Sequence, residues 1–170
     1  MGSPDFGIPS FKKILETGIE VPAVVTVPDK QKGRGLKMQF SDVKKFALEN
    51  NIEVLQPHNL SDEQFIKRLN DLNPDLFIII AFRILPPEIF KIPKLGSINL
   101  HASLLPKYRG AAPINHAIIN GETKSGLTTF FLDDKVDTGN IILQKEIDID
   151  INDTFGDVYY RMSEKGSGGN

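Results

Sequence analysis

Short apolar runs alternate with amphipathic segments along this chain, and this alternation constrains the fold more than any other feature. The run "DLFIIIAF" (75–82) is almost continuously apolar, as expected for a strand of a parallel sheet that helices cover on both faces. The other predicted strands span 21–27, 52–56, 97–101, 127–132 and 141–147, and the predicted helices span 7–17, 41–50, 61–72 and 113–120.

This order predicts an α/β fold, with a three-layer, open and mostly parallel sheet. The last two strands have no helix between them, so we expect them to form a late antiparallel hairpin. Local sequence signals mark the ends of some predicted helices. Gly18 ends the first helix, and Ser61 and Gln64 form a capping-box pattern at the start of the third helix. The stretch "PDKQKGRGLK" (28–37) reads as a basic loop punctuated by glycine.

Composition narrows the function classes. A net charge of −2 gives no strong overall attraction to nucleic acid. The absence of cysteine excludes disulfides, a thiolate nucleophile and cysteine-ligated zinc. We find no signal peptide, no apolar run long enough to span a bilayer and no dinucleotide or P-loop pattern. We therefore expect a cytoplasmic protein of one domain, without a membrane partner and without a metal.

The stretch "SINLHASLLPKYRGAAPINHAI" (97–118) carries the first candidate site residues. Asn99 and His101 lie two residues apart on a predicted strand, so their side chains point to the same face. The strand ends there, and ligands of open α/β sheets bind beyond the carboxyl ends of strands. An amide and an imidazole can donate to an oxyanion, and an imidazole can also move a proton.

A carboxylate partner is expected from "FLDDKVDTGNI" (131–141), which carries three acidic residues. Asp137 is the best candidate, because Thr138 and Gly139 follow it and glycine permits a tight backbone. The set suits acyl transfer to an amine without a covalent enzyme intermediate, and no serine nucleophile elbow is present. Two structural alternatives remain. A histidine at the end of a strand is commonly hydrogen-bonded within the core, and Asp137 could form an Asx turn.

Other features have simpler interpretations. Arg109 could pair with any surface acid, and His58 and His116 have no neighbours at metal-ligand spacing. The acidic stretch "DIDINDTFGD" (148–157) fails as a calcium loop, because Asp153 stands where glycine is needed and Tyr159 where glutamate is needed. Residues alone therefore lead to an α/β domain in which an acyl or one-carbon transferase is one interpretation.

A family resemblance extends this reading. The stretch from "INLHASLLPKYRGAAP" to "DDKVDTGNII", the opening "GSPDF" and the "VPDKQKGRG" loop resemble the formyltransferase domain of methionyl-tRNA formyltransferases. The resemblance covers nearly the whole chain, and its two main signatures are specific to enzymes that use 10-formyltetrahydrofolate. "RGAAPI" together with "VDTG" looks more like the tRNA enzymes than like their amino-sugar or glycinamide-ribonucleotide relatives.

The resemblance implies transfer of a formyl group from 10-formyltetrahydrofolate to the amino group of methionyl initiator tRNA, a step of translation initiation. Asn99, His101 and Asp137 match the family's catalytic triad: the first two would stabilise the oxyanion, and Asp137 would hold the imidazole and assist proton transfer. The implied folate-binding residues are Phe82, Arg83, Ile84 and Leu85, with Ser103, Leu104, Leu105 and Pro106. The implied tRNA contacts are Lys32, Arg34 and Lys37, in a loop that begins at Lys30.

The chain departs from the family pattern in three ways. The family has an apolar strand before the glycine turn, and Met1 stands where that strand ends, so we expect this first strand to be missing. We expect an incomplete catalytic domain (1–165) and a flexible tail (166–170), without the family's C-terminal tRNA-binding barrel. Arg83 replaces the usual glycine, which predicts a charged side chain near the pterin pocket.

Three alternatives follow from these departures and from the breadth of the family. The first is a formyltransferase that acts on an amino sugar or a nucleotide. The second is a formyltetrahydrofolate hydrolase. The third is an inactive folded fragment, for which an oligomer could replace the missing strand.

Overall fold

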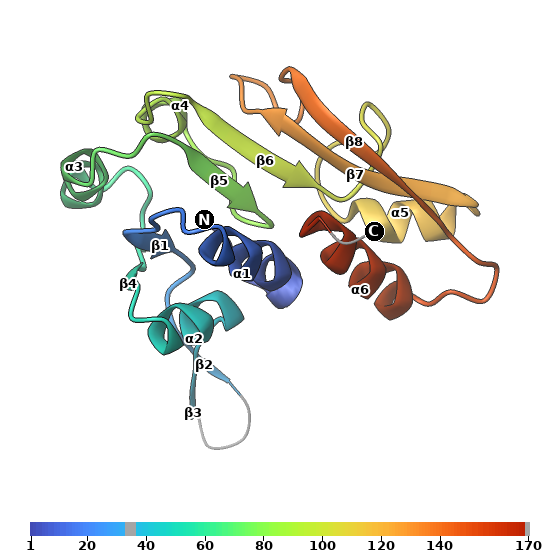
Figure 1. Ribbon diagram of the computed structural model, residues 1–170, viewed down its shortest axis with the longest axis horizontal. Coiled ribbons are helices and arrows are strands. Elements are labelled where there is room, and N and C mark those ends of the chain that lie inside the picture. The colour runs from blue at the N-terminus through green and yellow to red at the C-terminus, as the bar shows by residue number, and fades with distance from the viewer. Residues whose placement is uncertain (33–36, 169–170) are drawn as a thin grey trace.

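The computed structural model describes residues 1–32 and 37–168, and its strands and helices alternate as the sequence predicts (Figure 1). The strands are β1 (Ala23–Val25), β2 (Lys30–Lys32), β3 (Lys37–Gln39), β4 (Glu53–Leu55), β5 (Phe77–Ile80), β6 (Ser97–His101), β7 (Lys124–Phe131) and β8 (Ile141–Asp148). The helices are η1 (Asp5–Gly7), α1 (Ile8–Glu16), α2 (Asp42–Glu49), α3 (Glu63–Asp71), α4 (Pro87–Phe90), α5 (Pro113–Ile119) and α6 (Phe155–Gly166).

The main sheet has the strand order β5-β6-β7-β8. Strands β5 and β6 are parallel, with Ile79 opposite Asn99, whereas β6–β7 and β7–β8 are antiparallel. The predicted late hairpin is therefore confirmed as β7–β8. Strands β1 and β4 form a parallel pair of their own.

Met1 and Gly2 connect the two parallel pairs. The Gly2 N–H donates to the Val25 carbonyl at 3.0 Å, and the Ile80 N–H donates to the Met1 carbonyl at 2.9 Å. Gly2 also forms a parallel bridge with Ile80. The opening residues thus lie between β1 and β5 and align both strands in the same direction.

Two apolar cores cover opposite faces of the sheet, as the run of isoleucines predicts. Ile80 packs with Phe6, Ile114 and Met162 in the core that α5 and α6 share with the sheet. Ile79, its neighbour in β5, instead belongs to a core that includes residues of α3 and α4. Consecutive strand residues point to opposite faces, so β5 needs apolar side chains throughout. Figure 1 shows α1, α5 and α6 on one side of the sheet.

The structure corrects some local predictions. Residues of the predicted basic loop form an antiparallel pair, in which Lys30 of β2 lies opposite Gln39 of β3. Helix α3 is capped by Asp62, whose carboxylate accepts the Phe65 N–H, and not by Ser61. Gly166, the first residue of the predicted tail (166–170), is the last residue of α6.

One predicted tRNA contact, Arg34, lies outside the described residues. Lys32 and Lys37 are opposite each other in the β2–β3 ladder. Within the described ranges, no helix is long and apolar enough to cross a membrane. The same part of the chain contains no group of three or more His, Asp or Glu side chains placed to hold a metal ion.

Candidate active site

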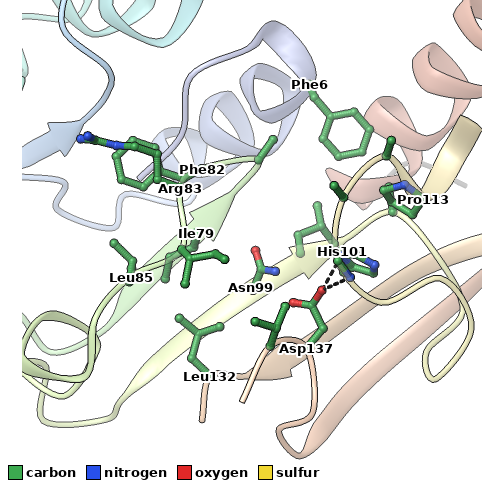
Figure 2. A pocket seen from close by; sticks show the side chains of 18 of the residues that line it. Phe6, Ile79, Phe82, Arg83, Leu85, Asn99, His101, Pro113, Leu132 and Asp137 are labelled. Atoms are coloured by element: carbon green, nitrogen blue, oxygen red, sulfur yellow. Dashed lines mark hydrogen bonds and ion pairs between the residues drawn. The ribbon is translucent and has the colours of Figure 1, made fainter. Parts of the chain in front are cut away.

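Asn99 and His101 lie near the carboxyl end of β6 and border a cavity with a volume of about 530 Å³. Figure 2 shows both side chains on the same side of the strand, with the Asn99 amide directed into the open space. No described residue hydrogen-bonds to that amide, and Asn99 is only partly buried. Its N–H groups are therefore available to a ligand.

Asp137 is the one of the three candidate carboxylates that reaches His101. Its Oδ2 lies 3.6 Å from Nδ1 of His101, and the two side chains are only 12% and 8% exposed. Asp133 instead accepts hydrogen bonds from Thr138 and from the Lys135 N–H, and the Thr138 bond lowers the pKa of Asp133. Asp134 forms an exposed ion pair with Lys91. The structure thus brings together Asn99, His101 and Asp137.

A close approach of two backbone segments holds the Asp137 loop. A Cβ atom at Gly139 would lie 1.7 Å from the carbonyl oxygen of Phe131, the last residue of β7. Only glycine fits at this distance. The sequence predicts a tight backbone after Asp137, and the structure has one where Gly139 approaches the Phe131 carbonyl.

The His101 ring is oriented by a main-chain oxygen. Nε2 lies 2.8 Å from the carbonyl of Tyr108. A carbonyl oxygen can only accept, so Nε2 carries a proton and donates it. Nδ1 is then the nitrogen that faces Asp137, at a distance longer than an ordinary hydrogen bond.

Left-handed backbone conformations gather around the site. Tyr108, Ala112 and Asp137 have φ values of 56°, 52° and 52°, and Ala81 at the end of β5 has a φ of 49°. Each such non-glycine residue costs about 1–3 kcal/mol and persists only where its surroundings hold it. Ala81, Ala112 and Asp137 line the cavity, and the Tyr108 carbonyl binds His101.

Of the eight residues expected to bind folate, the four that follow β5 line the cavity. Phe82, Arg83, Ile84 and Leu85 form part of its wall, where Figure 2 shows Phe82 and Leu85 near Ile79 and across from Leu132. Leu85 is buried, whereas Ile84 is 77% exposed at the mouth. This wall is apolar and could take a flat heterocycle.

The other four, Ser103–Pro106, do not line the cavity. The Thr128 hydroxyl, on β7, donates to the Ser103 carbonyl and accepts the Leu105 N–H. Gln144 of β8 donates to the Leu105 carbonyl at 2.9 Å. The structure therefore places this segment against the antiparallel strands, behind His101, where it supports the loop that leaves β6.

The guanidinium group of Arg83 does not point into the cavity. It donates to the carbonyls of Pro57 and His58, at 2.9 and 3.3 Å, and lies over the Phe82 ring. Its Nε atom is buried and has no partner among the described residues. The arginine thus joins the β5 end to the 57–58 segment.

Arg109 and Gly110 have a part in the site that we did not expect from the sequence. The Gly110 N–H donates to Asp137 Oδ2 at 2.7 Å, and Nε of Arg109 donates to the Asp137 carbonyl at 2.8 Å. Arg109 therefore binds the site's own loop and not a surface acid. The adjacency of "YRG" to a strand-end histidine was the available clue.

An aromatic group lines the far end of the cavity. Phe6 and Tyr159 pack edge to face at 5.1 Å, and Phe155 lies 5.4 Å from Tyr159. Burial and a hydrogen bond to Asp5 raise the pKa of Tyr159, which therefore stays neutral. These residues come from the chain's first turn and its last helix, so local sequence patterns do not indicate that they meet.

Comparison with known proteins identifies the family. A family model described as formyl transferase matches residues 3–169. The chain belongs to the formyl transferase family. Methionyl-tRNA formyltransferases from Clostridioides difficile and Flavobacterium johnsoniae are each 52% identical to it, over 168 and 167 residues.

Solved structures share the fold of this chain. Glycinamide ribonucleotide transformylase 1 from Symbiobacterium toebii superposes with a TM-score of 0.80 at 19% identity, and the match covers 99% of this chain and 80% of that one. WlaRD, a sugar 3N-formyl transferase solved in the presence of dTDP and 5-N-formyl-THF, has a TM-score of 0.69 at 30% identity. That match covers 98% of this chain and 57% of WlaRD.

The chain spans about half the length of the methionyl-tRNA formyltransferases it matches. The alignments cover 98% of this chain but 54% and 53% of the two relatives. The family and the α/β fold are therefore shown, whereas activity, substrates and partners belong to the proposal that follows.

Proposed function

We propose that this formyl transferase transfers a formyl group from 10-formyltetrahydrofolate to the α-amino group of methionyl initiator tRNA. The observation that carries the proposal is the position of Asn99, His101 and Asp137. All three border one cavity of about 530 Å³, with apolar walls on one side and an aromatic group on the other. A donor and an acceptor could approach from these two sides.

The apolar wall suits the donor's ring system. Ile79, Phe82, Leu85 and Leu132 form a slot that could hold a pterin, with Ile84 and Val136 at its mouth. Binding there would remove the exposed Ile84 and Val136 side chains from water, which favours association. We assign the donor contacts to Phe82–Leu85, and we assign Ser103–Pro106 to support of the loop.

The polar residues could perform the transfer. The acceptor amine attacks the formyl carbon, a C–N bond forms, and the carbonyl oxygen becomes an oxyanion. Asn99 donates to this oxyanion, with His101 beside it. Collapse of the intermediate breaks the bond from the formyl carbon to N10, and the proton lost by the amine is passed to N10. Asp137 and His101, both shielded from solvent, assist that proton transfer.

Two observations support a tRNA acceptor. The relatives at about 50% identity are named methionyl-tRNA formyltransferase. Lys30 and Gln31, at the base of the β2–β3 hairpin, are exposed, and we assign phosphate contacts to Lys32, Arg34 and Lys37 in this basic segment. A role in translation initiation places the protein in the cytoplasm.

An acceptor panel tests the proposal. The chain is incubated with 10-formyltetrahydrofolate and, separately, methionyl-tRNA, an amino-sugar nucleotide, glycinamide ribonucleotide or water alone. We expect formylated methionyl-tRNA, detected by mass spectrometry after deacylation. Formylation of the sugar or the ribonucleotide alone would overturn the assigned acceptor. Release of formate alone would indicate a hydrolase.

A further inference from the structure

The segment from Tyr108 to Gly110 contacts both members of the His101–Asp137 pair. Tyr108 accepts from His101 Nε2, Arg109 donates to the Asp137 carbonyl, and Gly110 donates to the Asp137 carboxylate. Three consecutive residues therefore contact two side chains from different elements, one from β6 and one from the β7–β8 connection. A shift of this segment would move both.

Tyr108 needs support to hold its carbonyl where it is. Its φ of 56° lies in the left-handed region, which a bulky residue rarely adopts. The neighbouring Arg109 is exposed and Gly110 has a φ of 86°. The backbone alone does not favour this path, so contacts that hold the segment are needed, and those of the Tyr108 side chain are among them.

The Tyr108 side chain is held on the outer side of the loop. Its hydroxyl donates to Glu122 Oε1 at 2.7 Å and accepts from the Asn120 amide at 3.1 Å. Its ring stacks on His116, with an interplanar angle of 9°. Asn120 and Glu122 follow α5, and neither they nor Tyr108 line the cavity. These contacts therefore act on the site only through the backbone.

We propose that Tyr108 is a positioning residue whose hydroxyl, held by Glu122, fixes the Nε2–H tautomer of His101 and the orientation of Asp137. The proposal rests on the proposed function for its kinetic consequence, but its structural part stands without it. Neutral imidazole has two tautomers, and the hydrogen bond of one nitrogen selects between them. Loss of the Tyr108–Glu122 contact would release the Tyr108 carbonyl from His101. Both tautomers of the imidazole could then form.

Three variants and two controls separate the role of the hydroxyl from effects on the fold. Tyr108→Phe keeps the ring and its stacking and removes the hydroxyl. Glu122→Ala removes the acceptor, and Glu122→Gln keeps an oxygen at that position. Tyr160→Phe is the matched control, because Tyr160 is 68% exposed and takes no part in the hydrogen bonds of the Tyr108 hydroxyl. Lys107→Met is a second control, because it removes the exposed ion pair to Glu122 and leaves the hydrogen bond from Tyr108 to Glu122 in place.

Nitrogen NMR of the imidazoles gives a readout that does not need activity. The chain has three histidines, so His101 can be assigned from a His101→Gln variant. At a pH where the ring is neutral, we expect wild-type His101 to show one protonated Nε2 and one unprotonated Nδ1. Tyr108→Phe and Glu122→Ala should give averaged signals of both tautomers, whereas Glu122→Gln, Lys107→Met and Tyr160→Phe should match the wild type.

Kinetics give the second readout. Misplacement of catalytic groups lowers the rate of the chemical step, so we expect kcat to fall about tenfold in Tyr108→Phe and Glu122→Ala. The KM for the donor should change less than about twofold, because neither residue lines the cavity. The double variant should be no slower than either single variant, since both remove one contact.

The two proposals fail in distinguishable ways. Unchanged His101 nitrogen signals in Tyr108→Phe and Glu122→Ala would overturn the positioning role. Altered signals in a chain that formylates none of the acceptors would uphold the positioning role and overturn the proposed function. A fall in thermal midpoint that accounts for the lost rate, with unchanged signals, would show that Tyr108 serves stability alone.

Discussion

The carboxylate of Asp137 lies 3.6 Å from Nδ1 of His101, although the two residues belong to different elements of the fold. His101 ends β6, and Asp137 lies in the connection between β7 and β8. Both side chains are shielded from solvent. A proton could therefore pass between the pair and a bound substrate with little contact with bulk water.

Asp137→Asn should remove the proton-transfer role with little effect on the fold. Asparagine tolerates the left-handed φ of 52°, and its side-chain oxygen can still accept the Gly110 N–H. General acid–base catalysis contributes about 10²–10⁴-fold, so we expect formyl transfer to fall by at least about 100-fold. Steady-state kinetics and a thermal midpoint measured together check this. A variant that keeps most of the activity would assign the proton transfer to another group.

Gly139→Ala should destabilise the loop that carries Asp137. The added Cβ would lie 1.7 Å from the Phe131 carbonyl oxygen, so the backbone must move. We expect a loss of about 1–3 kcal/mol in the free energy of unfolding, as for other forced steric changes, together with a loss of transfer activity. Urea unfolding measures the first effect.

Gly156→Ala is the matched control for this substitution. Gly156 lies in α6, and its added Cβ would meet only the Thr154 hydroxyl, at an ordinary 3.6 Å. Replacing a helical glycine by alanine gains up to about 1 kcal/mol. Equal effects of the two substitutions would contradict the close approach at Gly139.

Ile84→Asp should weaken binding of a folate analogue without unfolding the chain. Ile84 is 77% exposed at the mouth of the cavity and loses that exposure only when a ligand covers it. Burial of an isoleucine side chain is worth about 1.5–3 kcal/mol, so we expect the dissociation constant to rise at least about tenfold. Calorimetric titration with 5-formyltetrahydrofolate measures it. Ile151→Asp, at a residue that is 96% exposed and away from the cavity, should leave binding unchanged; similar losses in both would argue against this assignment of the donor site.

The pair Asp153–Arg161 should make stability depend on pH in the acid range. Hydrogen bonds from Arg161 lower the pKa of Asp153 to about 2 from an ordinary value of 3.8. The native state thus releases this proton more readily than the unfolded state, so the stabilisation is complete above about pH 4 and is lost as the pH falls toward 2. Arg161→Met should therefore lower stability more at pH 6 than at pH 2.

Urea unfolding across this pH range measures the difference. Arg161 also donates to the Asp148 carbonyl, so part of the difference will persist at low pH. Lys13→Met, which removes an exposed ion pair of α1, should show little effect at either pH. A difference between Arg161→Met and the wild type that stays constant with pH would contradict the lowered pKa.

Most elements of the fold could be predicted from the sequence, because their signals are local. The apolar run that includes Phe77–Ile80 requires burial on both faces, and Pro113 and Gly121 bracket α5. The β2–β3 pair gave no such signal, since its polar residues pair through the backbone and do not form a core face. Asp62 and Ser61 are both competent caps, and only the geometry of the turn decides between them.

The site could be predicted in part for the same reason. Asn99 and His101 follow from the alternation of one strand, and Gly139 marked the loop of Asp137. The contact of His101 with Tyr108 could not be predicted, because it depends on a left-handed residue and on Glu122 beyond the next helix. Ser103–Pro106 were expected at the folate site, yet they lie against Thr128 and Gln144. Which face a loop segment covers is decided by tertiary contacts.

A single-turnover measurement of His101→Ala tests whether His101 takes part in formyl transfer. The wild type and the variant, in excess over methionyl-tRNA and with saturating 10-formyltetrahydrofolate, are compared by the rate at which formylmethionyl-tRNA appears. Thermal midpoints and binding of a folate analogue are measured on the same samples. We expect a rate at least about 100-fold lower in the variant, with analogue binding and the fold retained. A rate near that of the wild type, or a loss matched by unfolding, would contradict a chemical role for His101.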